Sequence, residues 1–119
     1  KKAKPLKVVS DQLGSPTSTL SLSKLIADLI VTRRFGVYHA TDEGITNWFE
    51  FACEITKDMN VKIHPILTKE MPRPAIRPKY SGLDKSTLIS AIGHSTPLWQ
   101  ESLKDYLELR TVKEIAAFG

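Results

Sequence analysis

The residues best suited to binding a polar ligand gather at positions 11–17, which read Asp-Gln-Leu-Gly-Ser-Pro-Thr. A carboxylate, an amide and two hydroxyl groups lie there between an expected strand and an expected helix, the place where α/β proteins bind ligands. Free N–H groups at the start of that helix would favour phosphate or sugar oxygens. Spacing alone favours a simpler interpretation, an Asx-type turn followed by a helix N-cap. The candidate ligand-binding residues of this loop are Asp11, Gln12, Gly14, Ser15, Pro16 and Thr17.

A second candidate site lies in the proline-rich stretch at positions 68–83, which holds Arg73 and Arg77. The prolines exclude a helix, and the stretch is long for a connection without a function. The forked guanidinium group matches phosphate geometry better than a lysine ammonium does. Two exposed charges on a stiff loop would give the same pattern, so a binding role for Arg77 is a hypothesis.

The sequence holds no complete catalytic constellation. Its six glycines stand far apart, and none forms the glycine-rich turn after a strand that holds a dinucleotide pyrophosphate. Asp42 beside Glu43, or Asp11 with Glu43, offers a pair of carboxylates for acid and base catalysis, but charged turn residues are mostly solvated or capping. The three histidines lack the spacing of a zinc site. We therefore expect neither a cofactor nor a metal to be bound by this chain.

The elements that must position these loops alternate between strand and helix. Apolar residues at three-four spacing predict a helix over residues 22–30, capped by Thr17 or Ser18 and stopped by Gly36. A second helix is expected to open near Thr46 and to end at Asn60. Short apolar and β-branched runs predict strands over residues 6–9, 37–40 and 61–66.

Two more helices are expected in the last third of the chain. Asp84 caps a short one that Gly93 closes, and Thr96-Pro97 begins the last one. The order β-α-β-α-β favours parallel strands with helical crossovers. The predicted fold class is α/β, with a small, mainly parallel sheet of about three strands and four helices. The expected buried face of the last helix consists of Trp99, Leu103, Tyr106 and Leu107.

Length and composition bound the remaining possibilities. The 119 residues, 41% hydrophobic and 25% charged, suit one soluble globular domain over residues 1–119. No apolar run approaches the roughly 18 residues of a spanning helix. The single cysteine, Cys53, indicates a reducing compartment and hence the cytoplasm. The net charge of +4 would suit an anionic partner or merely solvated basic termini. A chain that begins Lys1-Lys2 without Met is expected to be a piece of a longer protein.

Five segments, taken in order, resemble the dTDP-4-dehydrorhamnose reductases of the extended short-chain dehydrogenase family. The first is similar to that family's V-x-D-Q-x-G-S-P-T signature, and the likeness runs over residues 6–109, nearly the whole chain. Each segment alone is a weak signal, whereas five in the right order are specific. The segments are Val8-Val9-Ser10-Asp11-Gln12-Leu13-Gly14-Ser15-Pro16-Thr17, Gly36-Val37-Tyr38-His39-Ala40, Trp48-Phe49-Glu50-Phe51-Ala52, Arg77-Pro78-x-x-Ser81-x-Leu83-Asp84 and Pro97-x-Trp99-x-x-x-Leu103.

The resemblance implies an enzyme that reduces dTDP-6-deoxy-L-lyxo-4-hexulose to dTDP-L-rhamnose with NADPH or NADH. It implies that this chain is the C-terminal substrate-binding part, with loop 11–17 beside the sugar-nucleotide cleft and Arg77 at the diphosphate. The family's N-terminal Rossmann domain and its Thr, Tyr and Lys catalytic residues would lie before Lys1. The chain alone is therefore expected to be inactive and to bind no cofactor. Without that domain, an exposed apolar patch would favour self-association.

Two other classes of function stay open from the sequence. The regulatory subunit of methionine adenosyltransferase is similar to these reductases, so a non-catalytic interaction module is the alternative. Nucleic-acid binding is suggested by charge alone, and it ranks last because no aromatic and basic residues share a regular face.

Overall fold

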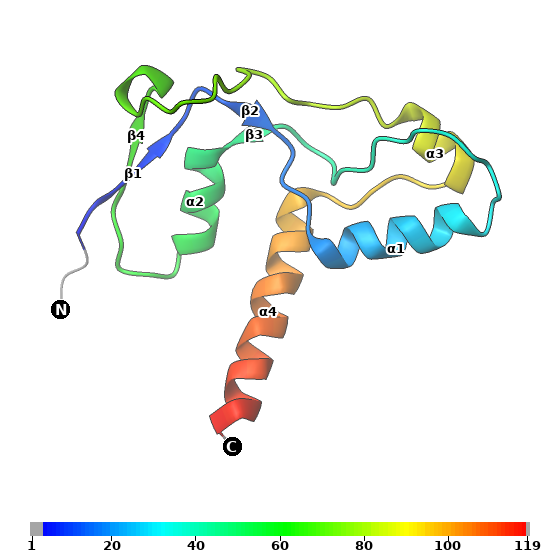
Figure 1. Cartoon of the computed structure of the whole chain (residues 1–119). Helices are drawn as coiled ribbons and strands as arrows, with labels where there is room; N and C mark the ends of the chain where they lie inside the picture. Colours follow the sequence, from blue (N-terminus) through cyan, green and yellow to red (C-terminus); the bar gives the residue numbers. More distant parts are fainter. Residues whose placement is uncertain (1–3, 119) are drawn as a thin grey trace. The chain divides into compact units, whose positions relative to one another are not determined.

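The computed structural model describes residues 4–118, with side chains described as far as residue 111. By its internal contacts the chain divides into two compact units. Figure 1 labels the helices and strands of both. Unit 1 combines Lys1–Ser15 with Ile45–Gly82, and unit 2 combines Pro16–Gly44 with Leu83–Gly119. The expected organisation as one domain stays a prediction.

The parallel sheet lies in unit 1. Strand β1 (Leu6–Val9) pairs with β4 (Ile63–Ile66), from Leu6 opposite Ile63 to Val9 opposite Ile66. Helix α2 (Trp48–Thr56) lies between these strands in the sequence and contacts both, as a parallel crossover requires. Both predicted strands are confirmed, although β4 begins two residues later than expected. Pro65 fits β4 because each strand of a two-stranded sheet is an edge strand.

A short antiparallel ladder precedes α2. Strand β2 (Leu13–Gly14) pairs with β3 (Thr46–Asn47), with Leu13 opposite Asn47. The Asn47 side chain accepts a hydrogen bond from the Glu50 N–H at 2.8 Å, and so caps the helix. The helix therefore begins at Trp48 and not at the expected Thr46, and it ends at Thr56 and not at Asn60.

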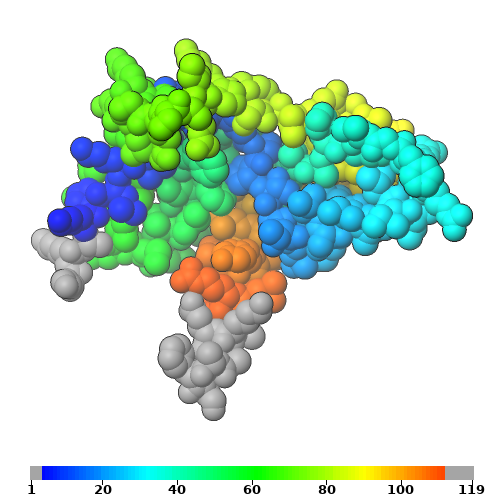
Figure 2. Space-filling view, viewed as in Figure 1, coloured from blue at the N-terminus to red at the C-terminus, as the bar shows by residue number. Residues whose placement is uncertain are grey.

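The long loop predicted for residues 68–83 is present, and residues 68–82 belong to unit 1. It opens with a 3-10 turn, η1 (Thr68–Glu70), and its residues 72–80 are all exposed (Figure 2, green to yellow-green). The far end of the loop is fixed to β2, because the Leu13 N–H donates to the Lys79 carbonyl and the Ser81 N–H donates to the Leu13 carbonyl, each at 2.8 Å. The loop is thus anchored at its end.

Unit 2 consists of helices α1 (Thr19–Ile30), α3 (Ser86–Ile92) and α4 (Trp99–Phe118). Ser18 caps α1 as predicted, since its hydroxyl accepts from the Ser21 N–H at 2.9 Å. The helix stops well before Gly36. Helix α1 contacts α3. The buried apolar side chains of the described residues are Leu25, Leu88, Trp99 and Leu103.

Helix α3 ends at the predicted residue, whereas its N-cap position differs from the predicted one. Gly93 closes it in the left-handed region at φ 80°, where glycine is favoured. Asp84 accepts from the Ser86 N–H at 2.8 Å, although Lys85 occupies the cap position. Helix α4 reaches Phe118, so the tail from residue 110 prolongs it. The helix buries Trp99 but leaves Tyr106 56% exposed, contrary to the prediction.

The predicted strand over residues 37–40 is wrong. Among the described residues this segment pairs with no strand, and Val37 is 88% exposed. Its β-branched and aromatic side chains favour a strand only when a neighbouring strand and a buried face are present. The parallel sheet accordingly has two strands instead of about three. The α/β class, with four helices and a small parallel sheet, is confirmed.

No helix among the described residues is both long enough and apolar enough to cross a membrane.

Candidate functional site

Unit 1 contains a groove of about 370 Å³, a volume within the range of small-molecule sites. Three segments form it: strand β1 with the residues after it, the start of α2, and the long loop. We call it the arginine groove. Its lining residues are Lys7, Val8, Val9, Gln12, Trp48, Met71, Arg73 and Arg77.

The charge of this groove is wholly positive. Lys7, Arg73 and Arg77 line it, and no lining residue is acidic. Both arginines are exposed on the loop, and no carboxylate of the described chain lies within ion-pair distance of either. Because guanidinium groups without a protein carboxylate bind phosphate oxygens well, the groove suits a diphosphate.

Asp11 holds the start of the loop that carries the arginines. One of its oxygens accepts from the Thr68 hydroxyl at 2.5 Å, and both accept from the Thr68 N–H, at 3.0 and 3.1 Å. These hydrogen bonds, the hydroxyl's first, lower the pKa of Asp11 below its ordinary value. The carboxylate is thus engaged within the protein and positions Thr68.

Gln12 is the one residue of loop 11–17 that lines the arginine groove. Its Nε2 donates to the Thr68 hydroxyl at 3.3 Å. Gln12 comes directly before β2 and Trp48 directly after β3, and the ladder pairs their neighbours, Leu13 and Asn47. The ladder therefore places both side chains at the groove.

Gly14 is required by close approach. A Cβ added there would lie 2.7 Å from the Ser81 hydroxyl, which donates to the Leu13 carbonyl at 3.0 Å. A side chain at position 14 would force the Ser81 hydroxyl to move and to give up this hydrogen bond. Ser15, the next residue, is the last of this stretch in unit 1 and is half-buried.

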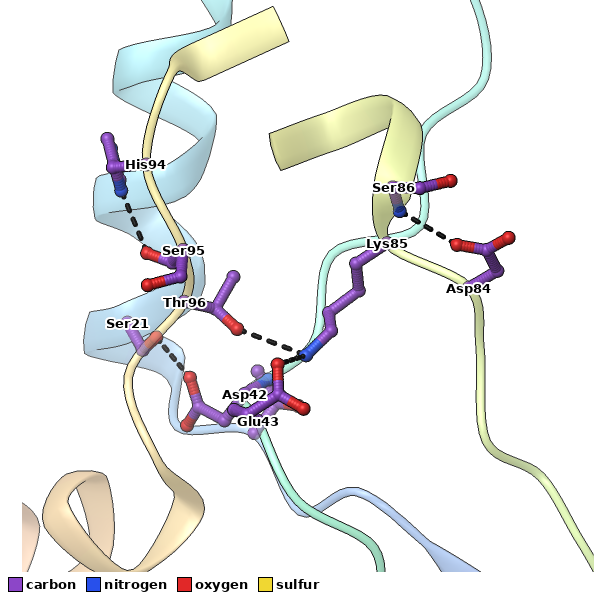
Figure 3. Close-up of polar contacts among 10 residues, drawn as sticks. Ser21, Asp42, Glu43, Asp84, Lys85, Ser86, His94, Ser95 and Thr96 are labelled. Atoms are coloured by element: carbon purple, nitrogen blue, oxygen red, sulfur yellow. Dashed lines mark hydrogen bonds and ion pairs between the residues drawn. The ribbon is translucent and has the colours of Figure 1, made fainter. Parts of the chain in front are cut away.

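Pro16 and Thr17 belong to unit 2 and lie just before α1. The Thr17 hydroxyl accepts from the Asp42 N–H at 3.1 Å. The fully buried Asp42 carboxylate accepts in turn from the Ser18 N–H at 3.2 Å and from the Ser21 hydroxyl (Figure 3). The anion expected at the start of α1 is therefore Asp42 of the protein itself. The sequence gives no signal for this pairing.

Glu43, the other carboxylate considered for acid–base chemistry, forms an ion pair with Lys85 at 2.6 Å (Figure 3). The hydrogen bond from Lys85, followed by its charge, lowers the pKa of Glu43. The same ammonium donates to the Thr96 hydroxyl at 3.2 Å, and only 11% of the Lys85 side chain is exposed. Lys85 thus links three segments of unit 2, and Asp42 and Glu43 are structural.

A larger groove, of about 610 Å³, lies in unit 2 between α1 and α4. Three carboxylates line it and only Lys24 opposes them with a permanent positive charge, so it repels phosphate. His94, which also lines this groove, pairs with Asp28 at 2.9 Å. For an anionic ligand, charge therefore favours the arginine groove over this one. The three carboxylates are Asp28, Glu101 and Asp105.

Within the described residues, no group of three or more His, Cys, Asp or Glu side chains could hold a metal ion.

The candidate residues that lie close together do so around the arginine groove. Loop 11–17 as a whole does not form one site. Of the predicted site residues, Gln12 and Arg77 line it, Asp11 supports it through Thr68, and Gly14 admits the loop end. Trp48, Met71 and Lys7 were missed, because only the β1–β4 and β2–β3 pairings bring them to one place. A ligand contact by any of these residues stays a prediction.

Curated proteins are similar to most of this chain. It is 36% identical over 108 residues to the spore coat polysaccharide biosynthesis protein SpsK of Bacillus subtilis, with 89% of this chain and 38% of the relative covered. It is 35% identical over 115 residues to the dTDP-4-dehydrorhamnose reductase of Sinorhizobium fredii, with 83% and 38% covered. The chain spans about two fifths of the length of the curated relatives it matches.

Solved structures show the same fold. A dTDP-4-dehydrorhamnose reductase from Clostridium acetobutylicum matches with a TM-score of 0.84 and 42% identity, over 90% of this chain and 39% of that one. The enzyme from Bacillus anthracis, solved in complex with NADP, matches with a TM-score of 0.83 and 36% identity, over 88% and 38%. The model of the family described as "RmlD substrate binding domain" matches residues 1–112. The resemblance found in the sequence is confirmed, and the chain belongs to the RmlD substrate binding domain family.

Proposed function

We propose that this chain is the substrate-binding part of a dTDP-4-dehydrorhamnose reductase and that its arginine groove holds the diphosphate of a dTDP-sugar. The observation that carries the proposal is the lining of the groove, in which Lys7, Arg73 and Arg77 meet no acidic residue. A diphosphate supplies the negative charge that these groups lack. Family membership supplies the identity of the nucleotide sugar.

In this proposal the whole protein reduces the 4-keto group of dTDP-6-deoxy-L-lyxo-4-hexulose and forms dTDP-L-rhamnose. A hydride from NADPH or NADH adds to C4, and a proton adds to the carbonyl oxygen. The described residues do not fit the dinucleotide, because the connection from β2 to α1 is Ser15-Pro16-Thr17-Ser18 and lacks a glycine-rich turn. The cofactor and an N-terminal Rossmann domain therefore belong to the remainder of the proposed enzyme, and this chain alone is inactive.

The free, half-buried Cys53 fits a reducing compartment, and the proposed enzyme is accordingly cytoplasmic.

Calorimetric titration of the 119-residue chain with dTDP-rhamnose and with dTDP tests the proposal. The wild-type chain is expected to bind both ligands saturably. Arg77→Ala removes a charged phosphate contact and should weaken binding by about 1.5–3 kcal/mol, or roughly 10- to 150-fold. Arg34→Ala is the matched control, because it removes an exposed arginine of unit 2. No binding by the wild-type chain, or equal losses in the two variants, would contradict the proposal.

A further inference from the structure

We infer that the arginine groove recognises the nucleoside diphosphate portion of its ligand, with the indole of Trp48 stacked on the nucleobase and Arg73 as a second diphosphate contact beside Arg77. This inference rests on the proposed function. It adds two specificity-determining residues and assigns to the groove the nucleotide, and not the sugar.

Trp48 is an exposed aromatic side chain in a fixed position. The residue is 53% exposed, although large aromatic residues are usually well buried. The β2–β3 ladder and the Asn47 cap fix its backbone at the first residue of α2. Phe51, one turn later, meets the indole edge to face, with ring centroids 6.3 Å apart and planes at 73°. The indole is thus held in place while about half of the residue stays open for a ligand.

The rest of the lining favours a planar base over a sugar ring. Val8, Val9 and Met71 are apolar, and the neutral hydrogen-bonding groups of the lining are the Gln12 amide and the Trp48 indole N–H. A hexose lying against these three apolar side chains would leave hydroxyl groups without partners there, which is costly. A pyrimidine presents two apolar faces and a polar edge, and bases stack on aromatic side chains without needing many hydrogen bonds. The lining therefore selects the base as the ring that faces Trp48.

Arg73 completes the cationic part of the groove. Its guanidinium group makes a weak contact of 3.5 Å with the Met71 sulfur, and no carboxylate of the described chain pairs with it. Met71 also lines the groove, so the contact places the guanidinium beside another lining residue. Two arginines from one short stretch of loop, with Lys7 from β1, balance the charge of a nucleoside diphosphate.

The two tryptophans make the experiment possible. Trp48 lines the groove in unit 1, whereas Trp99 is only 6% exposed in unit 2. The full chain is titrated with dTDP, dTDP-rhamnose and inorganic pyrophosphate, and tryptophan fluorescence and calorimetry are both recorded. Binding of dTDP should quench the emission of Trp48, and Trp48→Phe, which leaves Trp99, should abolish the quenching.

Affinities of the variants locate each contact. Trp48→Ala should weaken dTDP binding by roughly 10- to 100-fold, the equivalent of ~1–3 kcal/mol of stacking, and leave pyrophosphate binding unchanged. Arg73→Ala should weaken the binding of dTDP and of pyrophosphate by similar factors. Tyr106→Ala, which removes a comparably exposed aromatic residue from unit 2, and Arg34→Ala should change neither.

The outcomes separate this inference from the proposed function. Wild-type binding of dTDP that Trp48→Ala leaves unchanged would overturn the stacking assignment while the proposed function stands. A loss confined to dTDP-rhamnose would place the sugar, and not the base, on Trp48 and would also overturn it. Unchanged affinities in Arg73→Ala would show that Arg73 is not a second phosphate contact. If the wild-type chain binds no dTDP ligand, the proposed function fails together with the inference.

Discussion

Asp11 and Thr68, which are 57 residues apart in the sequence, join the two loops of unit 1 through one carboxylate, which accepts from the Thr68 hydroxyl at 2.5 Å and from its N–H. The two residues meet despite this separation in sequence because β1 and β4 are parallel and their carboxyl ends lie at one edge. Asp11 follows the first strand and Thr68 follows the second. A residue that the sequence suggests as a ligand contact therefore fixes the origin of the arginine loop.

Replacing Asp11 should consequently loosen the loop. In Asp11→Ala the Thr68 N–H loses its acceptor, and amide hydrogen exchange over residues 68–70 should become faster. Binding of dTDP should weaken as well, because Arg73 and Arg77 follow on the same loop. Asp58→Ala, which removes an exposed carboxylate elsewhere in unit 1, is the control. Unchanged exchange at these amides in Asp11→Ala would show that the contact does not order the loop.

Acid should release the same contact. The folded chain holds the pKa of Asp11 below its ordinary value of 3.8, so the carboxylate contributes stability that is fully present above that value and is lost as the pH falls through the folded-state pKa. Urea unfolding at pH 7, 5 and 3 measures this loss. The wild-type chain should lose more stability between pH 5 and pH 3 than Asp11→Asn does. Identical acid dependence in both would contradict the assignment.

His94 gives a pH dependence of the opposite sign. The Ser95 carbonyl, which accepts from its ring, and then Asp28 raise the pKa of His94 above its ordinary value of 6.5. Its contribution to stability is fully present below 6.5 and is lost as the pH rises through the folded-state pKa. His94→Gln should therefore flatten the decline of stability between about pH 6 and 8. The matched control is His64→Gln, which replaces an exposed histidine of β4 and should leave that decline intact.

The difference between local and distant signals explains what the sequence predicted. Helix α1 with its Ser18 cap was predictable, because the cap and the apolar spacing lie within a few residues. The strands of residues 6–9 and 61–66 were predictable for the same reason. The β2–β3 ladder was not, because two-residue strands carry no periodicity. Residues 37–40 have the composition of a strand but no partner among the described residues, and strand formation depends on a partner more than on composition.

The candidate site divides in the same way. Gln12 and Arg77 were found because their side chains suit a ligand wherever they lie. Trp48 reaches the groove only through a ladder that the sequence did not reveal. Asp42 reaches α1 across a separation of 21 to 25 residues from its partners, too far for any turn or capping pattern to indicate.

Asp42 should be among the most sensitive positions of unit 2. It is fully buried, and its removal leaves the Ser18 N–H and the Ser21 hydroxyl without their acceptor. Asp42→Ala should cost about 1.5–3 kcal/mol of unfolding free energy in urea, the range for hydrogen bonds to a charged group. Asp42→Asn, which keeps one acceptor oxygen, should cost less, and the exposed Asp105→Ala should cost almost nothing. A neutral Asp42→Ala would show that this carboxylate does not hold α1.

Self-association is the last expectation that the structure makes specific. The end of α1 and the segment after it expose Ile30 at 69%, Val31 at 79%, Phe35 at 95% and Val37 at 88%. So many exposed apolar side chains within eight residues are unusual for a monomer, and a second copy would cover some of them. Sedimentation at rising concentration should show dimers or larger species in the wild-type chain. Phe35→Ser combined with Val37→Ser should shift the chain toward monomer, because the pair removes the two most exposed of these four side chains.

The matched control is Ile76→Ser, which removes a single apolar side chain that is 99% exposed in unit 1. A wild-type chain that stays monomeric at high concentration, or equal shifts in the double variant and the control, would show that this segment does not mediate association.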